Sequence, residues 1–224
     1  MKKTPLILSA LFFAGSQGAF AQDIFDNPDN RAYLGVRLGL DISCPADVKS
    51  GPVSFDLYNP GAGFEAGAVY NIPVWKNLYF EPGLMLYYST MKTDVTIISP
   101  ELSPVSATSS ARRFGFRVPL RAGYRFDFEP VSVSVFTGPR LTLPLVGRMH
   151  TSVKTGYETA SKSENLYGDG SELKRVDLGW QFGAGVSFGQ WMFEISGTVG
   201  MLDMYKGTPS MHESGVDLTV GYNF

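Results

Sequence analysis

Ser-Gly-Val-Asp-Leu-Thr-Val-Gly-Tyr-Asn-Phe, residues 214–224, ends the chain with a strict alternation of apolar and polar side chains. Successive side chains of an extended strand point to opposite faces, so this stretch predicts a strand with one apolar and one polar face. Its apolar row ends on the carboxy-terminal aromatic residue. The same alternation returns along most of the chain.

Eight segments show this alternation, at 31–41, 62–71, 78–91, 112–126, 131–143, 174–188, 190–202 and 214–224. Their connections are alternately long and short, at 42–61, 72–77, 92–111, 127–130, 144–173, Gly189 and 203–213. An even strand count with long extracellular loops and short periplasmic turns is typical of bacterial outer-membrane barrels. We therefore predict an all-β fold, an eight-stranded antiparallel up-and-down transmembrane β-barrel over residues 31–224. Ten strands are the alternative if 42–61 or 144–173 also pair.

Residues 1–21 have the pattern of a secretory signal peptide. A basic start at Lys2 and Lys3 precedes an apolar run at 6–14 and a small-residue cleavage site at 19–21. The apolar run is about half of the ~20 residues that a transmembrane helix needs. We expect cleavage before Gln22, with 22–30 as a short periplasmic segment and the barrel in the cell outer membrane.

The apolar row of each predicted strand is expected to face lipid, and the interleaved Gly, Ser, Thr and charged residues the lumen. A soluble ligand-binding barrel would have the reverse arrangement. Six aromatic residues are predicted at the periplasmic rim: Trp75, Phe126, Phe128, Phe188, Trp191 and Phe224. Three prolines, Pro82, Pro119 and Pro139, fall inside predicted strands, where we expect β-bulges or bends.

The predicted inward positions bear charges of both signs in nearly equal number. They are Arg37, Arg113, Arg117, Arg121, Arg125, Arg140 and Arg175, with Asp41, Glu65, Glu81, Asp177, Glu194 and Asp217. A lumen of eight strands is just wide enough for side chains to fill, and charges there need partners. We predict arginine–carboxylate pairs that plug the barrel. The alternative is a narrow ion or small-solute channel lined by the arginines.

An outer-membrane lipid-modifying enzyme is a third hypothesis. His150 with Ser152, and His212 with Glu213 and Ser214, lie in or beside predicted extracellular loops. A nucleophile needs a base within hydrogen-bond reach, but neighbours on a strand point to opposite sides. We therefore predict no catalytic residues. The sequence also shows no metal-ligand spacing, no cofactor motif and no basic-aromatic strip for nucleic acid.

Four motifs resemble a known family. They are Tyr79-Phe80-Glu81-Pro82-Gly83-Leu84, residues 117–124 (Arg-Val-Pro-Leu-Arg-Ala-Gly-Tyr), Gly138-Pro139-Arg140 and Gly183-Ala184-Gly185-Val186. Together they resemble the small outer-membrane β-barrel family of Bacteroidota, labelled PorT-like or porin-family. The resemblance implies a fold and a compartment, and an extracellular or secretion-system protein as a partner, but no activity.

We expect a structural or surface-interaction protein that acts through its extracellular loops. Outer-membrane lipids would surround it, and the barrel-assembly machinery would insert it. A terminal Phe is the usual closing signal of outer-membrane barrels, so Val220, Tyr222 and Phe224 are predicted to form that assembly signal.

Overall fold

The computed structural model describes residues 31–45, 48–50, 53–55, 60–99, 102–155, 158–167, 171, 173–206 and 212–224. The predicted signal peptide and the segment 22–30 lie outside these residues.

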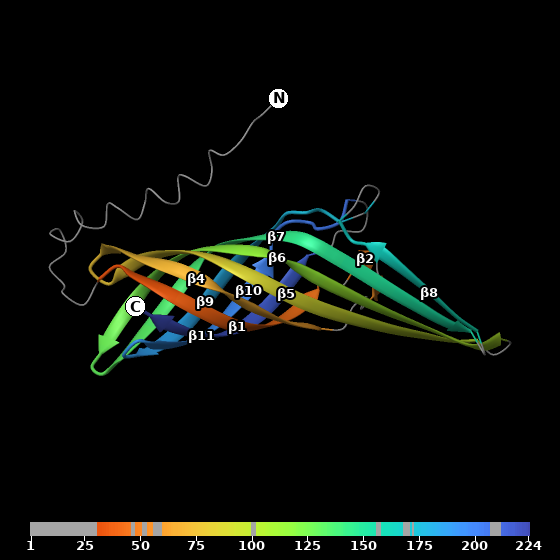
Figure 1. The fold of residues 1–224 in the computed structure, drawn as a ribbon, viewed down its shortest axis with the longest axis horizontal. Helices are drawn as coiled ribbons and strands as arrows, with labels where there is room; N and C mark the ends of the chain where they lie inside the picture. Colours follow the sequence, from red (N-terminus) through yellow and green to blue (C-terminus); the bar gives the residue numbers. More distant parts are fainter. Residues whose placement is uncertain are drawn as a thin grey trace, which may run out of the picture.

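Eight long strands form a closed antiparallel ring (Figure 1). In ring order they are β1 (Tyr33–Pro45), β4 (Gly61–Trp75), β5 (Leu78–Ser99), β6 (Leu102–Phe128), β7 (Val131–Thr155), β9 (Asp177–Phe188), β10 (Trp191–Gly200) and β11 (Glu213–Asn223). Each strand pairs with its neighbours in this order, and β1 pairs with β11 to close the ring. The predicted up-and-down barrel of eight strands is confirmed.

The two ends of the barrel differ. At one end, short turns join β4 to β5, β6 to β7, and β9 to β10. The carboxy-terminus lies at this end too, where the Phe224 amide donates a hydrogen bond of 2.9 Å to the Leu34 carbonyl. We call this the short-turn end and the opposite one the long-loop end.

The two faces of each strand follow the predicted alternation. On β1, Leu34, Val36, Leu38 and Leu40 are exposed on the outside, whereas Arg37 and Asp41 are buried inside. On β10, Phe193 and Ile195 are exposed while Glu194 and Ser196 are buried. A side-chain period of two therefore makes an apolar outer wall and a polar interior from the same strands.

Three strands are much longer than predicted. β5, β6 and β7 continue at the long-loop end through residues 92–99, 102–111 and 147–155, which we had expected to be loops. A further strand, β8 (Glu158–Asn165), pairs with the distal part of β7. These four segments form a projection, here called the sheet extension, which stretches beyond the ends of the other barrel strands (Figure 1).

The sheet extension does not enlarge the ring. β8 pairs with β7 where β9 does not, so the barrel has eight strands and not ten. The connection between β1 and β4 contains a separate hairpin of β2 (Val48–Ser50) and β3 (Val53–Phe55). Segments 42–61 and 144–173 therefore do contain strands, but they add no further strand to the ring.

The three prolines that we had expected to disrupt their strands do not shift the register. On either side of Pro82 and Pro119 the paired residues keep one register, although the ladder skips a few pairs beside each proline. Pro139 pairs with Trp180 in an unbroken register. The expected bulges at these prolines are therefore wrong. A register shift occurs instead between Phe114 and Gly115, opposite Pro144 and Val146.

Candidate functional site

The inward face of the ring contains a network of buried arginines and carboxylates. Arg113, Arg117 and Arg121 follow one another every four residues on β6, so all three point inward at successive heights. Their partners come from β1, β4, β5, β10 and β11. Removing an ionised group from water is costly unless it is paired, and this accounts for the number of contacts.

The first group lies toward the short-turn end and is called the Arg121 cluster. Arg121 Nη1 is 2.6 Å from Glu194 Oε1 and 3.6 Å from Glu81 Oε1. Glu81 Oε2 also lies 3.4 Å from Arg37 Nη2, and Arg37 Nη1 donates to Asn223 Oδ1 at 2.9 Å. With two arginines and two carboxylates, this cluster has no net charge.

The second group, the Arg117 cluster, lies nearer the long-loop end. Arg117 donates through Nη2 to Asp41 Oδ2 and through Nη1 to Glu65 Oε2, both at 2.9 Å, and Asp217 Oδ1 lies 3.7 Å from Nη1. Arg140 Nη1 donates to Asp217 Oδ2 at 2.7 Å. Asp41 and Asp217 are direct partners in the β1–β11 register, so Arg117 bridges two adjacent like charges.

The third group is a pair that the sequence analysis missed. Arg113 donates through Nη1 and Nη2 to Glu213 Oε2 and Oε1, at 2.5 and 2.7 Å. We had considered Glu213 only beside His212, as part of an enzyme. The period of two could have placed it, because Glu213, Gly215 and Asp217 share one face of β11.

Two charged residues behave differently from the prediction. Arg175 is exposed and lies before β9, where its Nη2 donates to the Tyr167 carbonyl, so its placement in the lumen is wrong. Arg125 does line the inside, but its partner is not an acid. Its Nη2 donates to Tyr33 Oη at 3.0 Å, and its guanidinium lies 5.5 Å from the ring centres of Tyr33 and Tyr79.

The two mouths of the barrel also differ. At the short-turn end, Arg125 and Tyr33 border an open depression of about 480 Å³. At the long-loop end, Tyr167 and Met204 are both almost fully buried, and burial raises the pKa of the Tyr167 phenol. The segments around these two residues are joined by a bridge between Leu173 and Tyr205. Buried side chains therefore lie at the long-loop end of the lumen.

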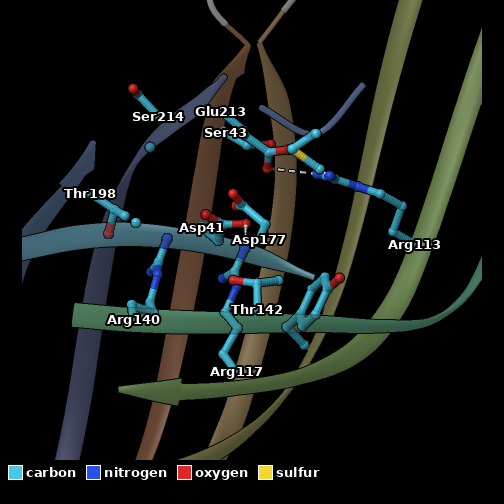
Figure 2. A pocket seen from close by; sticks show the side chains of 14 residues that line it. Asp41, Ser43, Arg113, Arg117, Arg140, Thr142, Asp177, Thr198, Glu213 and Ser214 are labelled. Atoms are coloured by element: carbon cyan, nitrogen blue, oxygen red, sulfur yellow. Dashed lines mark hydrogen bonds and ion pairs between the residues drawn. The ribbon is translucent and has the colours of Figure 1, made fainter. Parts of the chain in front are cut away.

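Asp177 is the one predicted lumen acid that forms no ion pair within the described part of the chain. It is only 8% exposed, and its Oδ1 has no hydrogen-bond partner there. Asp177 borders a cavity of about 10 Å³ together with Asp41, Ser43, Tyr87 and Thr198. Figure 2 shows Arg117 and Arg140 pointing toward Asp41 and Asp177 in this cavity.

The candidate catalytic residues form no nucleophile–base–acid arrangement in the described residues. His150 is exposed on β7, and its Nδ1 lies 2.9 Å from Ser163 Oγ on β8. Both Glu213 oxygens are held by Arg113, so the acid beside His212 binds a guanidinium. Ser214 lies at the cavity, on the strand that also contributes Glu213.

The three residues of the predicted assembly signal lie along β11 and just beyond it. Val220 and Phe224 are exposed on the outside, and the rings of Tyr222 and Phe224 are 5.0 Å apart. Their role in insertion stays a prediction.

This arrangement defines a small β-barrel with an apolar exterior and a charge-filled interior, the class that spans outer membranes. Residues 20–206 match the family model described as an outer membrane protein beta-barrel domain, and the chain belongs to that family. It is an outer-membrane protein. Among the described residues, no helix is long and apolar enough to cross a membrane.

Several solved structures are similar. The Ail attachment invasion locus protein of Yersinia pestis, solved with a heparin analogue, is 15% identical over 86% of this chain and 99% of its own, with a TM-score of 0.38. Neisserial surface protein A has the same identity and TM-score over 86% and 97%. LpxR from Salmonella typhimurium is 9% identical over 86% and 100%, with a TM-score of 0.31. No curated protein matches the chain.

Proposed function

We propose that this barrel is a plugged membrane anchor that presents the sheet extension to macromolecules at the cell surface. The observation that supports this proposal most directly is the length of β6. It has 27 residues, whereas a tilted strand needs only ~9–11 to cross the bilayer. The distal residues of β5, β6, β7 and β8 therefore extend well beyond the hydrocarbon layer.

The sheet extension has two free edges within the described residues. Beyond Thr90, which pairs with Ala62, β5 pairs only with β6, and β8 pairs only with β7. Unpaired strand edges expose backbone donors and acceptors that can bind another extended chain. A protein partner that adds a strand to one of these edges is therefore the interaction that the geometry favours. An extracellular or secretion-system protein is the partner that we propose for such an edge.

The experiment that tests this role shortens the sheet extension without changing the barrel. Deleting 94–108 and joining Thr93 to Ser109 by an Asn-Gly turn keeps their pairing. Deleting 152–161 and joining Thr151 to Lys162 in the same way shortens the second hairpin. We expect normal insertion but loss of cell attachment to protein-coated surfaces. Attachment equal to that of the intact chain would contradict the proposal.

A control variant keeps the backbone and changes only two exposed hydroxyls. Ser161→Thr with Ser163→Thr on β8 preserves strand length and hydrogen-bonding capacity. We expect its attachment to equal that of the unmodified chain, so that a loss in the shortened protein is due to the missing sheet.

Outer-membrane lipids are the second partner that we propose. Four exposed residues with basic side chains lie at the base of the sheet extension, next to the apolar outer wall. They are Lys92, Arg112, Arg148 and His150. Arg112 and Arg148 are direct cross-strand partners, an arrangement that is unfavourable without an anion between them. Phosphate groups of the lipid surface would supply that anion.

A channel is less well supported. The buried ion pairs fill the middle of the lumen, and the cavity beside Asp177 is large enough for only about one water molecule. The enzyme hypothesis has no geometric support from His150, His212 or Glu213 in the described residues.

A further inference from the structure

The strand ladder of the barrel wall is interrupted at one point between β7 and β8 or β9. Pairing of β7 with β9 ends at Thr142, the partner of Asp177, and pairing of β7 with β8 starts only at Arg148. In the described part of the chain, residues 143–146 therefore have no partner strand on this side of β7. We call this interruption the wall gap.

The wall gap is irregular on its β6 side as well. The register shift between β6 and β7 leaves Leu145, which lies between Pro144 and Val146, without a partner on β6. Leu145 and Val146 are consecutive, yet they are 47% and 53% exposed, whereas a regular strand would turn one of them inward. Val176, just before β9, is exposed too. Three apolar side chains are thus exposed beside unpaired backbone.

An aromatic row indicates the depth of the wall gap in the membrane. Tyr88 pairs with Phe114, and Phe114 pairs with Val146, so all three lie at one level. The Tyr88 ring centre is 5.6 Å from that of Phe64. Aromatic rings favour the boundary between hydrocarbon and headgroups, and unpaired peptide groups are unfavourable within hydrocarbon. Both observations place the wall gap at the headgroup boundary of the long-loop end.

Two arginines lie next to the wall gap on the outer face. Arg112 and Arg148 are exposed cross-strand partners, each two residues beyond the aromatic row. Neither forms an ion pair or a hydrogen bond with another described side chain. Exposed Lys92 and His150 occupy the next row, on either side of β6. Like charges in cross-strand positions are unfavourable, whereas the guanidinium fork fits phosphate oxygens.

We propose that the wall gap and the arginine pair form one binding site for a single phosphorylated lipid of the outer leaflet. The phosphate lies between Arg112 and Arg148, and one acyl chain packs against Leu145, Val146 and Val176. The inference rests on the lipid partner of the proposed function and adds the location of the site, the contact with a chain and a stoichiometry of one. The long-loop end faces the cell exterior in barrels of this class, so the outer leaflet supplies the lipid.

The test measures lipid binding to the purified barrel in uncharged detergent by native mass spectrometry. Monophosphoryl lipid A, inorganic phosphate and a diacylglycerol are titrated separately. We expect one molecule of monophosphoryl lipid A per barrel at concentrations where the other two probes do not bind. Inorganic phosphate has no chain for the wall gap, and diacylglycerol has no phosphate for the arginines. Equal binding of either probe would overturn the proposal.

Arg112→Gln with Arg148→Gln removes the phosphate half of the site. We expect the dissociation constant for monophosphoryl lipid A to rise at least about tenfold, because charge-assisted hydrogen bonds are lost. The matched control is Lys154→Gln with Lys162→Gln, which removes two exposed positive charges from the sheet extension and should bind as the unmodified barrel does. Equal dissociation constants for the two variants would refute the site.

Leu145→Ser with Val176→Ser alters the chain half and keeps both arginines. We expect several-fold weaker binding of monophosphoryl lipid A. The control Ile42→Ser with Val216→Ser changes two exposed apolar residues on β1 and β11, across the ring, and should bind normally. Circular dichroism shows whether each variant keeps its strands. If the unmodified barrel does not bind monophosphoryl lipid A, the lipid partner of the proposed function fails too, whereas equal binding by all variants overturns this site alone.

Discussion

Arg113 and Glu213 meet across the lumen in a two-pronged ion pair, with N–O distances of 2.5 and 2.7 Å, although they stand 100 residues apart. Their strands, β6 and β11, lie on opposite sides of the ring. The fork of the guanidinium fits the two carboxylate oxygens, a geometry that lysine cannot reproduce. The pair therefore joins the two walls of the barrel.

Removing only one partner of this pair should be costly. We expect Arg113→Met to lower the free energy of unfolding by about 3–5 kcal/mol, because Glu213 keeps a buried charge without a partner. Urea unfolding in lipid vesicles measures this. Adding Glu213→Gln should restore most of the loss, and a double variant less stable than Arg113→Met alone would show that the pair is not the reason.

The exposed Arg175 supplies a matched comparison. Arg175→Met removes an arginine from the same end of the molecule, but one that only donates to the Tyr167 carbonyl. We expect a cost of about 1 kcal/mol or less in the same unfolding assay. A loss as large as that of Arg113→Met would mean that Arg175 belongs to the lumen after all.

The filled lumen should conduct poorly. In planar bilayers we expect no large, steady, ion-selective openings from the intact barrel, because paired side chains block its centre. Replacing Arg117 and Arg121 by Ala together should produce brief openings, because it breaks two clusters at once. Steady conductance from the unmodified protein would favour the channel hypothesis.

Gly115 lies at the register shift between β6 and β7, opposite Pro144. A Cβ atom there would lie 2.2 Å from the Leu143 carbonyl oxygen and 2.7 Å from Pro144 Cα, both backbone atoms. Gly115→Ala should therefore destabilise the barrel by about 1–3 kcal/mol. At Gly197 the nearest atom is 3.2 Å away in the Phe182 ring, so Gly197→Ala should cost less. Equal unfolding midpoints for the two variants would contradict this.

Deleting Phe224 should reduce insertion. The residue ends the outer apolar row of β11, and its amide bonds to Leu34 on β1. The fraction of protein that resists extraction from the outer membrane measures the effect. Phe128→Ala removes another exposed aromatic at the short-turn end and should insert normally. Normal membrane levels of the truncated chain would remove Phe224 from the assembly signal.

The sequence predicted the barrel because lipid imposes a period of two on every spanning strand. Residues such as Phe193 and Ile195 must face outward, and Glu194 must then face inward. The same signal is absent from 102–111, where Ser occurs at odd and even positions alike. Strand continuation there depends on pairing with β5 and β7, which alternation does not show.

The charge network was less predictable. Alternation identified most of the inward residues, but it cannot mark where a strand ends, and this is why Arg175 was misplaced beside Asp177. It also cannot tell which residues meet across the lumen. That depends on the stagger of the strands, so neither the Arg113–Glu213 pair nor the isolation of Asp177 could be deduced.

The side-by-side placement of Asp41 and Asp217 has a consequence for how the barrel is built. These residues sit on the first and last strands, so the seam that seals the cylinder brings two anions together. In the part of the chain that the structure describes, the ion pairs that offset this repulsion are made by Arg117 and Arg140, which come from the middle of the chain. Pairing of β1 with β11 is thus favourable only after β6 and β7 have brought these arginines into the lumen. Earlier pairing of the two terminal strands is unfavourable.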